Sequence, residues 1–160
     1  MLNRRFLIAL AMGATLAGCA TAPTPPSVPA TIAARADLST LNQLLKQAGL
    51  TETLQGSGPF TVFAPSDSAF RAVPVKIMED LAKHPDKLKD VLSYHVLGLR
   101  LTAAEARNSS IKTVHGATVA VSKAGEFVTI EDAMVTSADL AATNGVVHVI
   151  DKVLLPPARR

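Results

Sequence analysis

The chain has 160 residues with 16 basic and 13 acidic side chains, a formal charge of +3, and only 4% aromatic residues. The basic excess lies at the ends, in Arg4–Arg5 and Arg159–Arg160, so the chain between them carries 12 basic and 13 acidic side chains. This balance argues against a basic face for nucleic acid, and the single cysteine, Cys19, excludes an intramolecular disulfide.

The first eighteen residues have the pattern of a secretory signal peptide. Two arginines precede Phe6–Ala17, an uncharged apolar run that is too short for a bilayer span of about 20 helical residues. Leu16–Cys19 resembles the lipobox of bacterial lipoproteins, in which the cysteine is lipidated and becomes the first mature residue. We therefore expect removal of residues 1–18 and membrane anchoring through Cys19. The alternative is an ordinary signal peptide with a chance cysteine.

The next segment, residues 19–30, is expected to carry the lipid and to form a tether. Four prolines between Ala20 and Ala30 disfavour a helix and favour extended polyproline II. Plain disorder without a spacer role is the alternative. The domain itself is expected over residues 31–156, with 157–160 as a tail.

Helical patterns dominate the first part of this domain. Leucines recur at helical spacing over Asp37–Ala48, where Asp37 or Ser39 is the expected start and Gly49 the C-cap. Thr102 and Glu105 are spaced as a capping box at the start of a short predicted helix. The other helical segments that we predict are Leu50–Leu54, Val75–Lys83, Asp86–Ser93 and Thr102–Arg107.

The segment Thr61–Phe70 combines a strand, a stop, a cap and a helix. Thr61–Phe63 is β-branched and aromatic without charge, which is typical of a buried strand. Pro65 removes a ladder donor. Ser66 or Asp67 can then cap the helix that follows.

The last third of the chain reads as strands. Ser122–Glu126 is the expected hairpin loop, and Asn144-Gly145 is a turn signal. Helices first and strands last indicate an α+β fold. The predicted strands are Ile111–Val114, Ala117–Val121, Phe127–Ile130, Ala133–Ser137, Val146–Ile150 and Val153–Leu155, with Tyr94–Leu99 extended before them.

Three of these segments resemble signatures of the fasciclin (FAS1) domain family. Thr61–Phe70 resembles the first signature, Asn144–Pro156 resembles the family's closing strand pair, and Tyr94-His95 is similar to its Tyr-His motif. The resemblance implies one α+β domain, a twisted β-rich wedge or sandwich with helices packed on it. It also implies an adhesion or binding module and no enzyme, with Tyr94 and His95 as the candidate adhesion residues.

The four histidines lack the spacing of a metal motif, so we predict no metal, cofactor or catalytic site. By strand alternation His148 shares a face with Val146 and Ile150, and we expect it to be a buried structural residue bonded to a carbonyl or to an acid such as Asp67. We expect His95, at a helix–strand junction, to reach solvent. The alternative is that both Tyr94 and His95 only pack in the core.

A hydrolase triad could be drawn from Ser66, Asp67 and one histidine, either His95 or His148. The chain has no Gly-x-Ser-x-Gly elbow, and capping explains Ser66 and Asp67 with fewer assumptions.

The sequence therefore predicts an exported, lipid-anchored envelope protein that binds a protein or polysaccharide in adhesion. Ala20, which is not Asp, implies the outer membrane if the cell is Gram-negative, with the periplasmic or surface face left open. The runner-up is a binder of a small ligand or envelope polymer, which needs an apolar pocket with a few convergent polar groups. The oligomeric state is not predicted.

Overall fold

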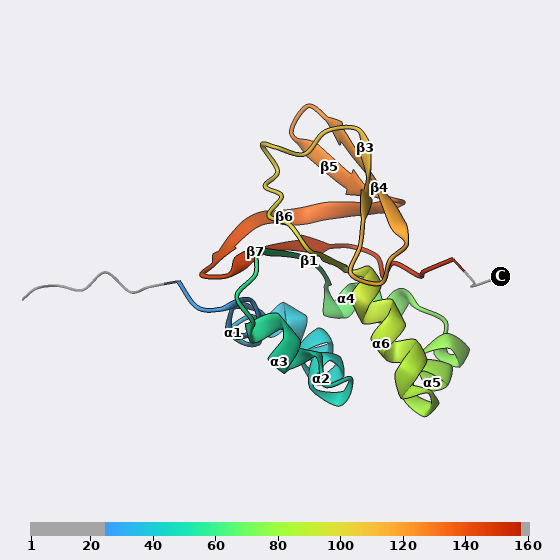
Figure 1. The fold of residues 1–160 in the computed structure, drawn as a ribbon. Coiled ribbons are helices and arrows are strands. Elements are labelled where there is room, and N and C mark those ends of the chain that lie inside the picture. Colours follow the sequence, from blue (N-terminus) through green and yellow to red (C-terminus); the bar gives the residue numbers. More distant parts are fainter. Residues whose placement is uncertain (1–24, 158–160) are drawn as a thin grey trace, which may run out of the picture.

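The computed structural model describes residues 25–157 and shows a curved seven-stranded sheet lying on a layer of short helices (Figure 1). The strand order is β2-β1-β7-β6-β5-β4-β3. The strands are β1 (Phe60–Pro65), β2 (Val96–Leu97), β3 (Ser109–Lys112), β4 (Thr118–Ala124), β5 (Phe127–Ile130), β6 (Ala133–Ala142) and β7 (Gly145–Ile150). The helices are α1 (Val28–Ala33), a 3₁₀ turn η1 (Ala36–Leu38), α2 (Ser39–Gln47), α3 (Leu50–Gln55), α4 (Asp67–Ala72), α5 (Val75–Lys83) and α6 (Pro85–Tyr94).

The parallel pair β1–β7 divides the interior into two hydrophobic cores. Every other strand pairing in the sheet is antiparallel. Successive side chains of a strand point to opposite faces, so Val62 and Val147 pack in one core with the helices, whereas Phe63 and Ile150 pack in the other with β4, β5 and β6. Both faces of the pair are thus covered, which confirms the predicted α+β class.

The sheet nearly closes on itself around the second core. Leu97, at the end of β2, forms an isolated bridge with Thr113, just after β3. The amide of Val114 donates to the carbonyl of Val96 at 2.8 Å. These contacts join the two outermost strands of the sheet.

The predicted end of the tether at residue 30 is wrong, because helix α1 already begins at Val28. Pro29 lies in the first helical turn, where its missing N–H costs nothing. Val28 and Ile32 are fully buried, so the folded part begins before residue 31. Cys19, residues 1–18 and residues 158–160 lie outside the described residues. Within residues 25–157, no helix is both long and apolar enough to cross a bilayer.

The predicted helix over Thr102–Arg107 is a single turn. Its capping box forms, with Thr102 N donating to Glu105 Oε2 at 3.1 Å and Glu105 N donating to Thr102 Oγ1 at 3.3 Å. The carbonyls of Ala103 and Ala104, which a continuing helix would pair with amides four residues later, accept from Lys123 Nζ at 2.6 and 3.2 Å. The Ala103 amide donates to Asp139 Oδ1 at 2.9 Å. Because Lys123 binds these carbonyls, the turn does not continue as a helix.

The predicted strand Val153–Leu155 is also wrong, so no closing strand pair forms. β7 already pairs with β1 on one side and β6 on the other and offers no free edge. The amide of Leu154 instead donates to His95 Nε2 at 2.9 Å.

Two turns differ from the predicted ones. The β4–β5 hairpin closes with Gly125-Glu126 alone, because Ala124 pairs with Phe127. The β6–β7 turn is Thr143-Asn144, and Gly145 is already part of β7.

Gly145 lies where the backbones of β7 and β1 leave no room for a side chain, and we expect its substitution to test the central pair. A Cβ at this position would clash with the backbone carbonyl of Phe60, which cannot move without shifting β1. Gly145→Ala should therefore lower the free energy of unfolding by about 3 kcal/mol, as overpacking does. Urea unfolding of this variant is compared with that of Gly98→Ala, whose Cβ would meet nothing within 4 Å. Equal stability of the two variants would contradict the role given to Gly145.

Candidate functional site

Ser66 and Asp67 cap two different helices. Ser66 Oγ accepts from Ala69 N at 3.3 Å and is the N-cap of α4, one of the two arrangements predicted. Asp67 turns away to α2, where its carboxylate accepts from Ser39 Oγ at 2.6 Å and from Thr40 N at 2.9 Å. The hydrogen bond from Ser39 lowers the pKa of Asp67. This carboxylate therefore joins the first turns of two helices that are far apart in sequence.

His148 is buried in β7, with both ring nitrogens bonded to backbone groups. Nδ1 accepts from Asp139 N at 3.2 Å, so Nε2 carries the proton and donates to the Leu101 carbonyl at 2.8 Å. The ring stacks on Phe63, with centroids 5.7 Å apart. Burial lowers the pKa of His148, against the Leu101 bond and the charge of Asp139. His148 is therefore buried, as expected. Its carbonyl partner is Leu101, whereas Asp67 binds α2.

His95 is 2% exposed, so the expectation that it reaches solvent is wrong. It follows the last turn of α6, where its Nδ1 donates to the Val91 carbonyl at 2.8 Å. Its Nε2 accepts from Leu154 N. The ring therefore points into the interior, where it meets the C-terminal segment. Burial lowers the pKa of His95 to about 4.

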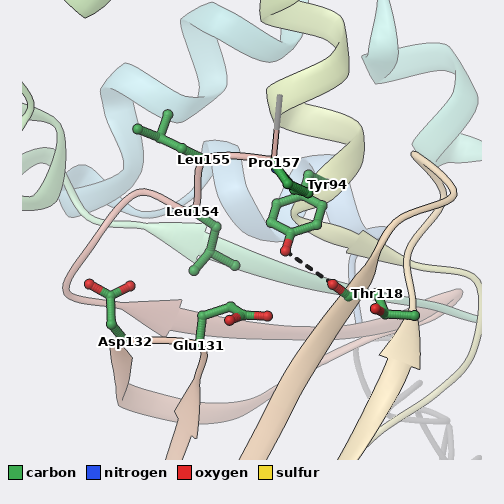
Figure 2. A pocket seen from close by; sticks show the side chains of 7 residues that line it. All are labelled: Tyr94, Thr118, Glu131, Asp132, Leu154, Leu155 and Pro157. Atoms are coloured by element: carbon green, nitrogen blue, oxygen red, sulfur yellow. Dashed lines mark hydrogen bonds between the residues drawn. The ribbon is translucent and has the colours of Figure 1, made fainter. Parts of the chain in front are cut away.

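Tyr94 is buried beside the same segment. Its hydroxyl donates to the Thr118 carbonyl at 3.1 Å (Figure 2). Its ring meets His115 edge to face, with centroids 6.0 Å apart. Burial and then the nearby charge of Glu131 raise the pKa of the Tyr94 hydroxyl. With both Tyr94 and His95 in the interior, this motif offers almost no ring surface to a partner.

The residues of the conceivable triad are not brought together as one site. Ser66 and Asp67 serve helix N-termini, while His95 and His148 direct both ring nitrogens to backbone groups. Among residues 25–157 there is no group of three or more His, Cys, Asp and Glu side chains that could hold a metal ion.

Three cavities surround the C-terminal segment. One of about 360 Å³ has the carboxylates of Glu131 and Asp132 on one side and Leu154, Leu155 and Pro157 on the other (Figure 2). A second, of about 460 Å³, is mainly apolar, with Lys87, Asp90 and His115 among its lining residues. A third, of about 280 Å³, lies against the α4–α5 junction. Leu155 lines all three.

Asn144 joins three parts of the chain, a role that the sequence prediction missed. Its Oδ1 accepts from Val28 N at 2.9 Å, and its Nδ2 donates to the carbonyls of Leu54 and Gly56 at 2.7 and 2.9 Å. Its own carbonyl accepts from Phe60 N at 3.0 Å. The Asn-Gly pair indicates a turn, but no local pattern indicates these long-range partners of its side chain.

Apolar side chains are exposed on the outer face of β5 and β6. Phe127 is 66% exposed and Met134 is 41% exposed. Met134 pairs with Thr129, and Thr129 lies two residues from Phe127 along β5, so all three share the outer face. The low aromatic content of the sequence does not predict an exposed aromatic residue on this face.

Comparisons with known proteins give consistent matches. The family model of the Fasciclin domain matches residues 36–156. Protein sll1483 of Synechocystis is 42% identical over 121 residues, 74% of this chain and 67% of that protein. A longer relative is the transforming growth factor-beta-induced protein ig-h3 of Sus scrofa, which is 38% identical over 123 residues. The match covers 76% of this chain and 18% of that protein.

Other relatives extend these matches. The immunogenic protein MPB70 of Mycobacterium bovis is 34% identical over 72% of this chain and 59% of its own length. The solved FAS1 domain pair from the insect cell adhesion molecule fasciclin I superposes with a TM-score of 0.66, at 20% identity. This match covers 83% of this chain and 52% of that one and shows the shared fold.

Because the Asp67 carboxylate caps α2, we expect Asp67→Ala to lower the free energy of unfolding. Removing the carboxylate leaves Thr40 N and Ser39 Oγ without their acceptor, which should cost about 1–2 kcal/mol, as loss of a cap does. Asp37→Ala is the matched control, since Asp37 makes an exposed pair with Arg35 that is worth at most about 1 kcal/mol. Urea unfolding of both variants measures the difference. A smaller loss for Asp67→Ala than for Asp37→Ala would contradict the capping role.

Proposed function

Because the chain belongs to the fasciclin-domain family, we propose that it is a lipid-anchored envelope protein whose single domain binds a protein or polysaccharide partner in adhesion. The family match over residues 36–156 carries this proposal. The structural neighbour is part of an insect cell adhesion molecule, which supports an adhesive role. The polar candidates Ser66, Asp67, His95 and His148 all serve hydrogen bonds within the fold, and we infer binding in place of catalysis.

The proposed anchor is Cys19, at the outer membrane. Pro26, seven residues later, already contacts the domain, because its carbonyl accepts from Thr143 N at 3.1 Å. Seven residues at a polyproline rise of about 3.1 Å each would place the domain about 22 Å from the lipid. α1 packs with α2 and α3 at the helical end, away from the β4–β5 hairpin (Figure 1). A tether at this end holds the helices near the membrane and directs the hairpin outward.

The outward face of β5 and β6 is the proposed contact surface. Phe127 and Met134 are exposed there without a covering segment among the described residues. Aromatic side chains carry much of the binding energy in interfaces, because they bury a large area at low entropic cost. Phe127 is therefore the expected anchor of the contact.

A second candidate function is the binding of a small apolar ligand. The cavity of about 460 Å³ has a volume typical of ligand sites. Leu81, Val91 and Leu155 supply apolar walls, and His115 and Asp90 supply polar groups. Direct titration with a hydrophobic fluorophore tests this candidate separately from cell binding.

Lipid attachment is expected to depend on Cys19. Cys19→Ser should give no palmitate incorporation and should leave the protein out of the membrane fraction, because one thiol carries the proposed anchor. Gly18→Ala keeps a small residue before the cysteine and should be labelled normally. Metabolic labelling and membrane fractionation measure both variants. Absence of label on the unmodified protein would refute the anchor.

Adhesion is expected to depend on Phe127. Phe127→Ser should weaken binding of the full-length protein to intact producing cells by about tenfold or more, since loss of an aromatic anchor costs at least about 1.4 kcal/mol. Val75→Ser is the matched control, because Val75 is 71% exposed at the start of α5.

Melting temperature and cell binding are measured for both variants. Protease treatment of the cells separates a protein partner from a polysaccharide one. Equal binding by the two variants would place the contact away from β5 and β6.

A further inference from the structure

The C-terminal segment Val153–Pro157 has one hydrogen bond to the rest of the described chain. It follows β7 without forming a strand, Leu154 packs in the second hydrophobic core, and Leu154 N donates to His95 Nε2 at 2.9 Å. Within residues 25–157 no other hydrogen bond ties this segment down. Leu154 and His95 are each 2% exposed.

This hydrogen bond requires a neutral imidazole. Nδ1 lies 2.8 Å from the Val91 carbonyl, which can only accept, so Nδ1 carries the ring proton. Nε2 must then be the acceptor for Leu154 N–H. A second proton would occupy Nε2 and face the Leu154 N–H, so two donors would meet where one hydrogen bond had been.

We propose that His95 is an acid-sensitive latch, whose protonation releases Val153–Pro157 from α6 while the sheet stays folded. The sheet can remain because β7 is paired along its length with β1 and β6, whereas the released segment has no strand partner. Release removes Leu155 from all three cavities that it lines. It also uncovers Tyr94, which lies beside Leu154 and Pro157 (Figure 2).

The surroundings of His95 set the direction of the pH dependence. Burial holds its pKa at about 4, and the Val91 carbonyl acts in the opposite direction. No charged side chain contributes to this pKa from α6, from β1 or from the C-terminal segment. Of the nearby titratable rings, Tyr94 packs on His115, and His148 bonds to Leu101 and Asp139.

Opening is therefore favoured by acid. Once the segment is released, the pKa of His95 returns toward the ordinary histidine value of 6.5. The open form then binds a proton at pH values at which the closed form stays neutral. Opening becomes easier as pH falls from 6.5 to about 4 and is nearly independent of pH above that window. Between pH 7.4 and pH 5 the opening constant rises about 25-fold.

Amide hydrogen exchange on the full-length protein tests the latch. After correction for the intrinsic exchange rate, the protection of Leu154 N–H should fall about 25-fold from pH 7.4 to pH 5. It should be lower than the protection of Val147 and Val149 at each pH, and it should depend less on urea than theirs does, because opening of this segment exposes less surface than global unfolding. Leu154 protection equal to that of β7, with the same urea dependence, would show global unfolding and overturn the proposal.

Two substitutions separate His95 from the other buried histidine. His95→Gln keeps a side-chain amide that can accept a hydrogen bond but does not titrate, so the protection of Leu154 N–H should no longer fall between pH 7.4 and pH 5. His148→Gln is the matched control and should keep this fall in protection. A fall in protection that persists in His95→Gln would overturn the proposal. Should His95→Gln not fold, the imidazole titration of His95 followed by NMR in the unmodified protein must coincide with the Leu154 response, and a mismatch would also overturn it.

Discussion

The parallel pairing of β1 with β7 is the constraint on which the rest of this structure depends. The two strands align from Phe60 opposite Gly145 to Pro65 opposite Ile150 and bury both of their faces. A parallel pair cannot be joined by a short hairpin. The intervening chain must leave β1, form α4 to α6 on one side, build the curved sheet on the other and return. One alternating pattern of side chains thereby supplies the helical core and the sheet core together.

Buried polar side chains fasten the irregular segments to this pair. Thr61 Oγ1 donates to the Leu99 carbonyl at 2.7 Å and accepts from Leu101 N at 2.8 Å, while His148 binds the Leu101 carbonyl from β7. His95 holds the C-terminal segment in the same manner. Because an unpaired buried polar group costs about 1–3 kcal/mol, each of these side chains fixes its segment in one position.

The buried polar side chains of the described residues are threonines and histidines, so the interior needs no charged side chain. Thr61 and Thr113 carry no charge at any pH, and burial lowers the pKa of His95 and His148, so both rings stay neutral to a lower pH than an exposed histidine does. Both histidines accept a backbone N–H through one ring nitrogen. Polar residues that look reactive in the sequence therefore maintain the architecture. The surfaces left for binding are the exposed face of β5 and β6 and the cavities around Leu155.

The sequence by itself determined the α+β class, the main helices, a cap at Ser66 or Asp67 and the burial of His148, because these follow from local periodicity and capping chemistry. Only the tertiary structure decided where long-range partners outweigh local preference. Asp67 serves α2 and not α4, Thr102–Glu105 stops after one turn, and Val153–Leu155 forms no strand because β7 has no free edge. His95 is buried for the same kind of reason: the Leu154 amide that pairs with its ring comes from a segment 59 residues away, a proximity that no local pattern encodes.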